Sequence, residues 1–366
     1  IRSFFFFLGI LFKRYSFDIV FYYPRHFNRG LNANNYYINY LLSTCDNNNI
    51  SYILFEEPDF CSNRRSNKNA VGFDFIFLII ILLRKIIYSR DIINTDKRIG
   101  KILSFTFFRR FHFNNYVTLS QSMLSVFSTI NQSAKLYDLQ HGIIYNNKKS
   151  YIFNGSVAEN IYKNNVMLLV TGSNFRNLLV SNDNSEYFKK NIYVIGCNNK
   201  SKIKHNYFNN NILITLQFTS DHSFVENRIL FDNLKEYILN LNKDFNFYLR
   251  HHPRFNNEID ISELFKEDNI TMAPDSLDMC FDLCSVHMTS YSTTTFESAL
   301  LGIPTIFIPS LDLSKNFSHF FNYPLYCSIN ELSCNSLYQE NSIMLQNWAN
   351  KYYEPFNDSY FIKLMQ

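Results

Sequence analysis

The chain has 366 residues, of which 46% are hydrophobic and 18% are charged. A chain of this length exceeds one compact core of ordinary size and predicts two domains. The net charge of +4 is small and no long basic tract occurs, which argues against a nucleic-acid-binding protein. Because 38 Phe and 25 Tyr accompany abundant Asn, Ile and Lys, the aromatic content reflects an AT-rich genome and does not indicate a stacking surface.

Two apolar runs resemble membrane segments but are too short to be such segments. The first, residues 1–12, is followed at once by two basic residues and lacks a small-residue cleavage site, so we expect a buried first strand rather than a signal peptide. The second, Phe73–Leu83, contains an Asp and is shorter than the roughly 20 residues of a membrane span, so we expect a buried helix. The predicted location is the cytoplasm, and a peripheral association with the inner face of the plasma membrane stays open.

Seven cysteines, an odd number, are scattered along the chain, which predicts reduced and mostly buried thiols. Cys280 and Cys284 share a face if their segment is helical, but no second Cys or His pair stands at zinc-ligand spacing around them. We therefore expect no metal ion and no cofactor. The cysteines are Cys45, Cys61, Cys197, Cys280, Cys284, Cys327 and Cys334.

Short β-rich runs alternate with helical segments in both halves of the chain, and this order predicts parallel βαβ units. A polar stretch, Cys197–Asn210, separates the halves. In the first half the alternation runs through Tyr52–Phe55, Phe73–Tyr88, Tyr116–Ile130, Val166–Val170 and Ile192–Gly196. In the second half we expect strands at residues 212–216, 245–250, 286–288 and 305–308, and helices at 226–241 and 294–301.

The predicted fold is therefore α/β, with two Rossmann-like, doubly wound domains that face each other across a cleft. We place an acceptor-side domain at residues 1–200 and a nucleotide-donor-binding domain at residues 207–345. Residues 346–366 are expected to form a helix that packs back on the first domain. Ligands of open α/β sheets bind at the carboxyl ends of the strands, so motifs at those ends are the candidates for chemistry.

The first candidate motif joins a strand end to the start of a helix. Hydroxyl residues precede this helix, and free backbone N–H groups with hydroxyls at a helix N-terminus can bind phosphate. The donor-phosphate candidates are Ser290, Ser292, Thr293 and Thr294. Glu297, near the first turn, could accept hydrogen bonds from ribose hydroxyls. The alternative is that the hydroxyls only cap the helix.

The second motif is Arg250-His251-His252-Pro253, at the predicted end of a strand. Arg250 suits bidentate contact with a phosphate, and a histidine can donate to a phosphoryl oxygen or protonate a leaving group. Neighbouring side chains of a strand point to opposite faces, so the two histidines would chelate a metal poorly and one of them only packs. We assign the working role to His252, because Pro253 restricts its backbone.

The third motif is Gln140-His141-Gly142, which follows an apolar strand of the first half. Glycine lets the backbone approach a ligand, and the imidazole of His141 could deprotonate an acceptor hydroxyl. A lone histidine in a turn is more often structural, but His141 lies in the opposite predicted domain from the phosphate motifs. We expect Gln140, Gly142 and the strand-end pair Gly172-Ser173 to line the acceptor side.

Two weaker candidates are Gln217 and Thr219, which follow the first strand of the second half and could reach the donor phosphates. Six further histidines have no supporting context and are expected to be ordinary residues. They are His26, His112, His205, His222, His287 and His319.

In their order along the chain, the three motifs resemble those of GT-B enzymes of bacterial capsule, lipopolysaccharide and teichoic-acid synthesis. Asp138–Tyr145 is similar to the QHG segment of capsular-polysaccharide biosynthesis proteins. Arg250–Pro253 is similar to the HP motif of sialyltransferases, Kdo transferases and CDP-glycerol glycerophosphotransferases, and Ser290–Glu297 to their phosphate-binding stretch. The resemblance covers residues 135–310. It implies that His252 and the Ser292–Thr293 region hold the donor phosphate, Glu297 lies near the ribose, and His141 near the acceptor or donor phosphate.

Two departures from these families leave the donor undecided. The acidic base motif of the sialyltransferases is absent, and Gly142 is followed by Ile143-Ile144 where the teichoic-acid enzymes carry an HGTP-like segment. The prediction is a metal-independent glycosyltransferase that moves a sugar from a nucleotide-activated donor to a bacterial surface glycan or lipid-linked acceptor, with His141 and His252 as catalytic residues. Three alternatives stay open: a CDP-polyol phosphotransferase of teichoic-acid type, a UDP-sugar 2-epimerase and a non-catalytic GT-B scaffold. The oligomeric state is not predicted.

Overall fold

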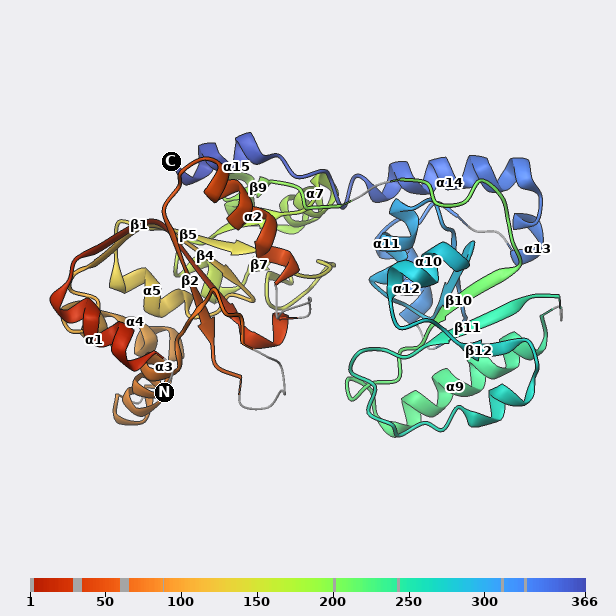
Figure 1. Cartoon of the computed structure of the whole chain (residues 1–366), viewed down its shortest axis with the longest axis horizontal. Coiled ribbons are helices and arrows are strands. Elements are labelled where there is room, and N and C mark those ends of the chain that lie inside the picture. Colours follow the sequence, from red (N-terminus) through yellow and green to blue (C-terminus); the bar gives the residue numbers. More distant parts are fainter. Residues whose placement is uncertain are drawn as a thin grey trace. The chain divides into compact units, whose positions relative to one another are not determined.

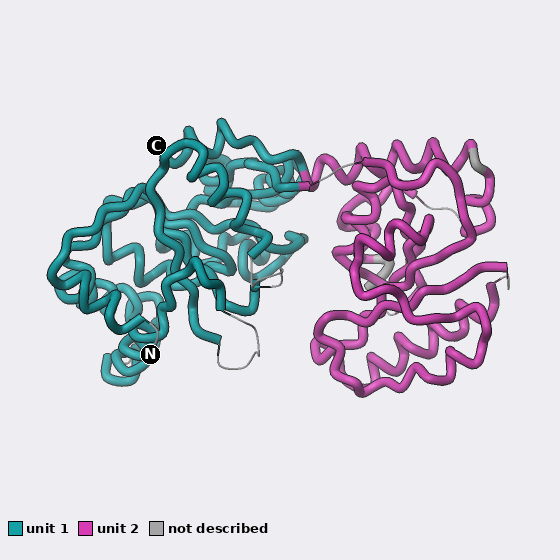
Figure 2. Tube along the Cα trace, viewed as in Figure 1, with its two compact units in different colours: residues 1–198, 354–366 teal, residues 199–353 magenta. Residues whose placement is uncertain are grey.

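The computed structural model (Figure 1) describes residues 3–28, 35–59, 66–87, 89–199, 202–241, 244–310, 313–325 and 328–366. The chain forms two compact units (Figure 2): unit 1 contains residues 1–198 and 354–366, and unit 2 contains residues 199–353. The chain therefore crosses between the units twice. The first crossing falls inside the polar stretch Cys197–Asn210, and the return lies after Tyr353 rather than at residue 346.

Unit 1 is built on a seven-stranded parallel sheet in the order β3-β2-β1-β4-β5-β8-β9. Its order reverses between β1 and β4, so the carboxyl ends of these two strands flank the point where open α/β sheets bind ligands. The strands are β1 (Tyr15–Pro24), β2 (Tyr52–Glu57), β3 (Val71–Gly72), β4 (Phe111–Leu119), β5 (Lys135–Leu139), β8 (Met167–Val170) and β9 (Ile192–Val194). A short hairpin, β6 (Ile152–Phe153) and β7 (Ser156–Val157), follows β5.

Helices cover both faces of this sheet, which is why its strands are apolar almost throughout. Alternate residues of β1 serve the two faces: Phe21 packs with Ile38 and Phe361 on one side, whereas the ring of Tyr22 contacts Phe73 and Phe127 on the other. The helices of unit 1 are α1 (Phe4–Phe12), α2 (Tyr36–Asn47), α3 (Asp74–Ile86), α4 (Ile92–Phe105), α5 (Leu124–Ile130), α6 (Glu159–Tyr162), α7 (Ser173–Asn182), α8 (Tyr187–Lys190) and α15 (Asp358–Met365).

The first apolar run forms the helix α1, so the prediction of a buried strand there is wrong. α1 buries Phe7 and Ile10, whereas Phe5 and Phe12 are exposed, and the first strand begins only at Tyr15. An apolar run without alternation does not distinguish a helix from a buried strand, which is the physical reason for the error. The first two residues of the run lie outside the described residues.

The second apolar run is helical, as predicted, but it is not a buried helix. α3 buries Ile76 and Ile80, whereas Leu82 and Ile86 on its other side are exposed. The apolar composition of this helix therefore exceeds what its packing against the sheet requires, and part of its surface faces away from the core.

The return segment is hydrogen-bonded to the end of the unit 1 sheet. Cys197 N donates to Glu354 O at 2.9 Å, and Asn357 N donates to Ile195 O at 2.9 Å. Gly196 has a φ of +76°, and a Cβ there would lie 2.2 Å from Pro355 O, so only glycine fits this close approach. α15 follows and packs beside α2 (Figure 1).

Unit 2 holds a five-stranded parallel sheet in the order β12-β11-β10-β13-β14. The strands are β10 (Asn211–Thr215), β11 (Asn246–Arg250), β12 (Ile270–Met272), β13 (Val286–Thr289) and β14 (Thr305–Phe307). The helices are α9 (Phe224–Leu239), α10 (Leu277–Leu283), α11 (Thr294–Leu300), α12 (Leu313–Phe320), α13 (Ile329–Leu332) and α14 (Asn335–Ala349). The strands and helices expected in this half are present, β12 is additional, and the order reverses between β10 and β13. The prediction of two doubly wound α/β units is confirmed.

Candidate functional site

Three neighbouring strands of unit 2 end in polar side chains that the sequence singles out. Because β11, β10 and β13 lie side by side and run parallel, the loops that follow them emerge from one edge of the sheet. This edge flanks the point where the strand order reverses, which is where ligands of such sheets bind. The residues are Gln217 and Thr219 after β10, Arg250 and His252 at the end of β11, and Ser290, Ser292, Thr293 and Thr294 after β13.

The loop after β10 is fixed by the helix that follows it. Gln217 and Thr219 are both buried. Asn227 of α9 accepts the Thr219 N–H at 3.3 Å through Oδ1 and donates to Thr219 O at 3.0 Å through Nδ2. Ser223 and Glu226 form a capping box that begins α9. The loop therefore presents a defined backbone at the sheet edge.

Arg250 is anchored by the loop that follows β12. Its Nη1 donates to Pro274 O at 2.7 Å and lies 3.8 Å from the Sγ of Cys280. An arginine has five N–H donors, so this anchor uses only part of its hydrogen-bonding capacity. Among the described residues no carboxylate forms an ion pair with Arg250, which favours a role for its charge toward an anionic ligand.

The two adjacent histidines have different surroundings. The ring of His251 stacks on Phe255 with centroids 4.0 Å apart, and desolvation by burial lowers the pKa of His251. His252 Nδ1 accepts the N–H of Arg254 at 3.1 Å. Because an accepting ring nitrogen carries no proton, a neutral His252 carries its proton on Nε2 and can donate from there.

The hydroxyl residues after β13 divide into buried and accessible ones. Ser290 and Ser292 are buried, Thr294 is half-buried and Thr293 is exposed. Ser292 Oγ accepts the N–H of Thr294 at 3.2 Å, as a capping residue does, and donates to Thr294 Oγ1 at 3.1 Å. Ser292 thus serves the start of α11, while Thr293 is open to solvent at the sheet edge.

Glu297 stands in the first turn of α11 with an exposed side chain. Desolvation by the surrounding protein and, to a smaller extent, the charge of Asp278 raise the pKa of its carboxyl group to about 7, against the opposing effect of Arg250. The exposure of the side chain to water limits this rise. A carboxyl group with a raised pKa can exchange hydrogen bonds with hydroxyl groups both as donor and as acceptor.

Two contacts that the sequence analysis missed join these loops to one another. The imidazole Nε2 of His222, after β10, is hydrogen-bonded to the hydroxyl of Tyr291, after β13. Arg254, after β11, donates from both terminal nitrogens to the carboxylate of Asp221, with Nη1 at 3.0 Å. The sequence around His222 gave no sign of this hydrogen bond. Only the prediction that the loops after β10 and β13 leave the same edge of the sheet could have indicated it.

His287 lies inside the sheet beneath the same edge. It is fully buried, with Nε2 2.9 Å from Thr215 Oγ1 and Nδ1 2.9 Å from Thr305 Oγ1. Burial lowers its pKa to about 3, so the ring is neutral at ordinary pH. Thr305 Oγ1 is in turn hydrogen-bonded to Ser298 Oγ of α11 at 3.1 Å. His287 thus has a structural role that links three strands and the helix above them.

Gln140 in unit 1 shapes the turn after β5. Its side chain is buried, its Nε2 donates to Gly142 O at 2.8 Å, and its Oε1 accepts from Thr171 N at 3.0 Å and Thr171 Oγ1 at 3.2 Å. These bonds tie the turn to the end of β8. They favour a positioning role for Gln140 over the expected acceptor contact.

His141 and Gly142 follow in this turn and are half-buried. His141 Nε2 shares a hydrogen bond of 3.1 Å with Ser120 Oγ, after β4, and its ring meets Phe27, after β1, with centroids 5.2 Å apart. The structure therefore places His141 at the strand ends that flank the reversal point of unit 1. A Cβ added at Gly142 would meet no described atom within 4 Å, so the space beside this glycine is open.

The loop that holds Ser120 has a backbone that non-glycine residues rarely adopt. Ser120, Gln121 and Met123 have φ values of 57°, 57° and 54°, in the left-handed region. Each such residue costs about 1–2 kcal/mol, and clusters of them occur where a site requires a fixed geometry. The buried carboxylate of Asp138 accepts the N–H of Gln121 at 2.8 Å and the hydroxyl of Tyr151 at 3.3 Å. No glycine in the sequence signals this loop.

Asp138 is buried beneath the same turn, beside a lysine. Desolvation raises the pKa of Asp138 to about 7, against the opposing effects of the Gln121 N–H, Tyr151 and Lys148. Lys148 donates from Nζ to Ile143 O at 2.6 Å, and desolvation lowers its pKa. The buried Asp138 and the half-buried Lys148 thus support the QHG turn in addition to apolar packing.

The strand end at Gly172 and Ser173 is occupied by the return segment. Gly172 is buried, and Ser173 N donates to Glu354 Oε1 at 2.6 Å. A carboxylate at the N-terminus of a helix satisfies its free N–H groups, and here Glu354 does so for α7. This arrangement favours a structural role for the pair over the expected acceptor contact.

In the part of the chain that the structure describes, no group of three or more His, Cys, Asp or Glu side chains could hold a metal ion. In the same ranges no helix combines the length and the apolar character needed to cross a membrane. Cys45, Cys280 and Cys284 are buried and unbridged, whereas Cys61 and Cys327 lie outside the described residues. Independence from metal stays a prediction.

No family model and no characterised protein sequence matches this chain, but its structure is similar to several solved structures. The UDP-GlcNAc 2-epimerase of Methanocaldococcus jannaschii matches with a TM-score of 0.51 and 12% identity, over 96% of this chain and 99% of that one. The wall teichoic acid polymerase TagF matches with a TM-score of 0.52 and 14% identity, over 95% and 87%. The UDP-GlcNAc 2-epimerase of Neisseria meningitidis matches with a TM-score of 0.50 and 10% identity, over 96% and 99%.

These matches cover both units and nearly the whole chain. The chain has the GT-B fold. At such low identity the likeness concerns the fold and does not by itself assign a reaction, because one fold carries many functions. Any activity of this GT-B chain depends on the side chains at the two strand-end sites, and the narrower resemblance to capsule enzymes stays a prediction.

Proposed function

We propose that this GT-B protein is a glycosyltransferase, which moves a sugar from a nucleotide-activated donor to a glycan or lipid-linked acceptor. The observation that carries the proposal is the convergence of three loops at one edge of the unit 2 sheet. There Arg250, the Nε2–H of His252 and the exposed Thr293 supply a positive charge and hydrogen-bond donors. A phosphate group of a nucleotide donor requires such a set.

The reaction follows from the roles of these groups. The bond between the anomeric carbon and the phosphate oxygen breaks, and a bond from the anomeric carbon to the acceptor oxygen forms. Arg250 and His252 stabilise the negative charge that develops on the leaving phosphate. His141 takes the proton of the acceptor hydroxyl, held in place by Ser120 and Phe27. In this scheme the hydroxyl groups of the nucleotide ribose form hydrogen bonds with Glu297. The motif resemblance favours a bacterial surface glycan, such as capsule or lipopolysaccharide, as the product.

The structural likeness supports a nucleotide-linked donor. The N. meningitidis epimerase, similar over nearly its whole length, is bound to UDP-GlcNAc in its structure. Thermal-shift measurements with UDP, CMP and CDP would identify the nucleotide that unit 2 recognises. A ligand at a hundredfold excess over its Kd stabilises a protein by about 2.7 kcal/mol, which such a screen resolves.

Three variants at the end of β11 test the assigned site. H252N keeps an oxygen where Nδ1 accepts the Arg254 N–H but removes the Nε2 donor, whereas H252Q carries an amide donor to the position of Nε2. We expect H252N to weaken nucleotide binding about tenfold, the value of one charge-assisted hydrogen bond, and H252Q to weaken it less. The control H251A loses only the stack on Phe255. Equal nucleotide affinity of H252N and the parent protein would contradict the site.

The likeness to two UDP-GlcNAc 2-epimerases over nearly their whole lengths favours a second candidate, a UDP-sugar 2-epimerase. An epimerase inverts the sugar at C2 with no acceptor present, whereas a transferase leaves that centre unchanged. Incubation with UDP-GlcNAc alone, followed by NMR of the sugar, separates the two.

The likeness to TagF leaves a CDP-polyol phosphotransferase as a further alternative. It would turn over CDP-glycerol and not a nucleotide sugar, and a scaffold would turn over neither.

A further inference from the structure

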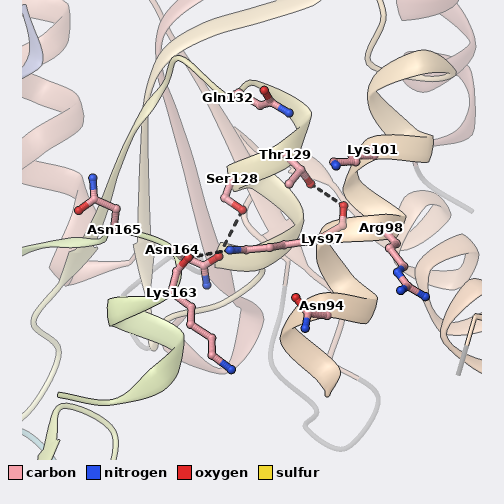
Figure 3. Close-up of a pocket in the computed structure, with 10 residues that line it drawn as sticks. All are labelled: Asn94, Lys97, Arg98, Lys101, Ser128, Thr129, Gln132, Lys163, Asn164 and Asn165. Carbon is pink, nitrogen blue, oxygen red and sulfur yellow. Dashed lines mark hydrogen bonds between the residues drawn. The ribbon is translucent and has the colours of Figure 1, made fainter. Parts of the chain in front are cut away.

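A pocket of about 600 Å³ lies between α4, α5 and the turn before β8, where no residue of the candidate site contributes (Figure 3). Its volume is in the range of pockets that hold small ligands. The described residues that line it include four cations and no carboxylate. The cations are Lys97, Arg98, Lys101 and Lys163. The remaining lining is hydroxyl and amide groups, so the pocket suits an anion that accepts several hydrogen bonds.

Two of the cations are fixed by the protein and two are available. Lys97 Nζ donates to Lys163 O at 2.6 Å, and Lys163 Nζ lies 3.4 Å from Asp91 and 3.5 Å from Glu159. Arg98 and Lys101 are exposed, and within the described ranges no carboxylate forms an ion pair with either.

The walls around these cations are held by hydrogen bonds. Thr129 Oγ1 donates to Lys97 O at 2.9 Å, and Ser128 Oγ donates to Asn164 Oδ1 at 3.3 Å. Figure 3 shows the Lys101 side chain reaching toward Thr129. The pocket is therefore a built feature of unit 1 with a free positive charge at its rim.

The face of α4 that carries Arg98 and Lys101 also carries an exposed aromatic side chain. Arg98, Lys101 and Phe105 recur at helical spacing on one side of α4, and the Phe105 side chain is 79% exposed. Leu82 and Ile86 on α3 and Phe5 and Phe12 on α1 are exposed as well. Large exposed apolar surfaces of this kind mark interaction sites.

Aromatic contacts make these helices one continuous structure. The ring of Phe75, on α3, lies 5.1 Å from that of Phe4 on α1 and 5.5 Å from that of Phe107, just after α4. The helices α1, α3 and α4 therefore form one packed group in unit 1, and their exposed apolar side chains belong to that group.

The positive charge of the segments that form α1, α3 and α4 indicates an anionic partner. Residues 4–14 and 74–110, which contain α1, α3 and α4, include ten Lys or Arg and three Asp, whereas the whole chain carries a net charge of only +4. Asp96 is already paired with Arg84 at 2.8 Å, and Asp91 with Lys163. Exposed Phe and Leu beside unpaired Arg and Lys are the combination that binds the interface of an anionic bilayer.

We propose that α1, α3 and α4 form a docking surface for an anionic phospholipid membrane. Phe5, Phe12 and Phe105 insert among the lipids, and the pocket beside α4 receives a headgroup phosphate on Arg98 and Lys101. A nucleic acid would not need the exposed phenylalanines, and an apolar protein partner would not need the cations. The surface brings the protein to the place where a lipid-linked acceptor resides, but its binding to lipid does not depend on the proposed transfer reaction.

Co-sedimentation with vesicles tests the docking surface. We expect the purified protein to bind vesicles of phosphatidylglycerol and phosphatidylcholine, and to bind pure phosphatidylcholine at least about tenfold more weakly. R98Q/K101Q and F5S/F105S should each lose about tenfold in partitioning, whereas K189Q/K190Q on α8 removes the same charge from exposed residues and should change it little. Raising the salt concentration should weaken binding of the parent protein.

Three results would overturn the proposal. Equal binding to neutral vesicles would remove the role of the cations. Release from anionic vesicles by millimolar inorganic phosphate at constant ionic strength would make the pocket a site for soluble phosphate. Absence of vesicle binding together with a dimer that F105S dissociates would make the surface a self-association interface. Nucleotide binding by each variant is measured in parallel, so that loss of docking is distinguished from a failed donor site.

Discussion

The carboxylate of Asp138 accepts the backbone N–H of Gln121 at 2.8 Å, and this bond joins the end of β5 to the left-handed loop after β4. Gln121 follows Ser120, whose hydroxyl is hydrogen-bonded to His141. The buried Asp138 thus fixes the backbone next to Ser120, and Ser120 in turn orients His141, the proposed base. The energy stored in the left-handed residues is offset by this bond and by the packing around it.

Replacement of Asp138 should release this loop. D138A leaves the Gln121 N–H without its acceptor, and we expect unit 1 to lose about 1–3 kcal/mol of unfolding free energy and His141 to lose its alignment. D138N still offers a carbonyl oxygen and should lose less. Hydrogen exchange followed by mass spectrometry on residues 119–125 measures the release directly. Protection of these amides in D138A equal to that of the parent protein would rule out the positioning role.

The buried imidazole of His287 should make unit 2 sensitive to acid. Its pKa is about 3 in the folded chain, below the ordinary value of 6.5, because burial disfavours the charged ring. Between these values the unfolded chain binds the proton and the folded chain does not, so the unfolding free energy falls as the pH falls from about 6.5 toward 3. H287Q lacks this titrating group, so its unfolding free energy should fall less than that of the parent protein over the same pH range.

Fluorescence of Trp348, the one tryptophan of the chain, offers the measurement for His287. Its indole stacks on Phe296 of α11 at 4.9 Å, so urea titrations followed by its emission report on unit 2. At pH 8 H287Q should be less stable than the parent by about 1–3 kcal/mol, because the hydroxyls of Thr215 and Thr305 lose good partners. The difference should shrink as the pH falls to 5, and an unchanged difference would contradict the buried neutral ring.

The sequence predicted the parts of this molecule that depend on local order. Short apolar strands followed by polar residues placed Arg250 and Ser292 at strand ends, and the parallel order of the sheet then brought those ends together. It could not predict contacts between distant segments, such as Glu354 at the N-terminus of α7, which lies 181 residues from Ser173. It also gave no sign of the left-handed loop at Gln121, since the residue type there does not favour that conformation.

The bond between Tyr291 and His222 should order the proposed donor site more than it stabilises the fold. Tyr291 stands between Ser290 and Ser292, and its hydroxyl joins the loop after β13 to the loop after β10. Y291F removes only that hydroxyl, and we expect nucleotide affinity to fall about three- to tenfold with less than about 1 kcal/mol lost in unfolding free energy. D221N, which breaks the exposed pair with Arg254, is the matched control and should do little. Titration calorimetry with the preferred nucleotide gives both affinities, and an equal effect of the two variants would deny the Tyr291 bond a specific role.

Gly142 offers the sharpest test of whether the QHG turn meets a substrate. A Cβ there would have no described atom within 4 Å, so G142A should fold with an unfolding free energy within about 0.5 kcal/mol of the parent, as surface changes usually do. If the open space receives the acceptor or donor, the added methyl group should lower kcat/KM about tenfold or more, because a small misplacement in a reacting complex is costly.

G302A is the contrasting variant for this test. Gly302 has a φ of +72°, and a Cβ would lie 3.1 Å from Ser342 Cβ and 3.2 Å from Ile203 Cγ1, so the substitution should cost unit 2 about 1–2 kcal/mol. A stable G142A with full turnover would show that the space beside the glycine is empty during the reaction. His141 would then have to be removed from the role of base, because the turn that carries it would lie away from the reacting atoms.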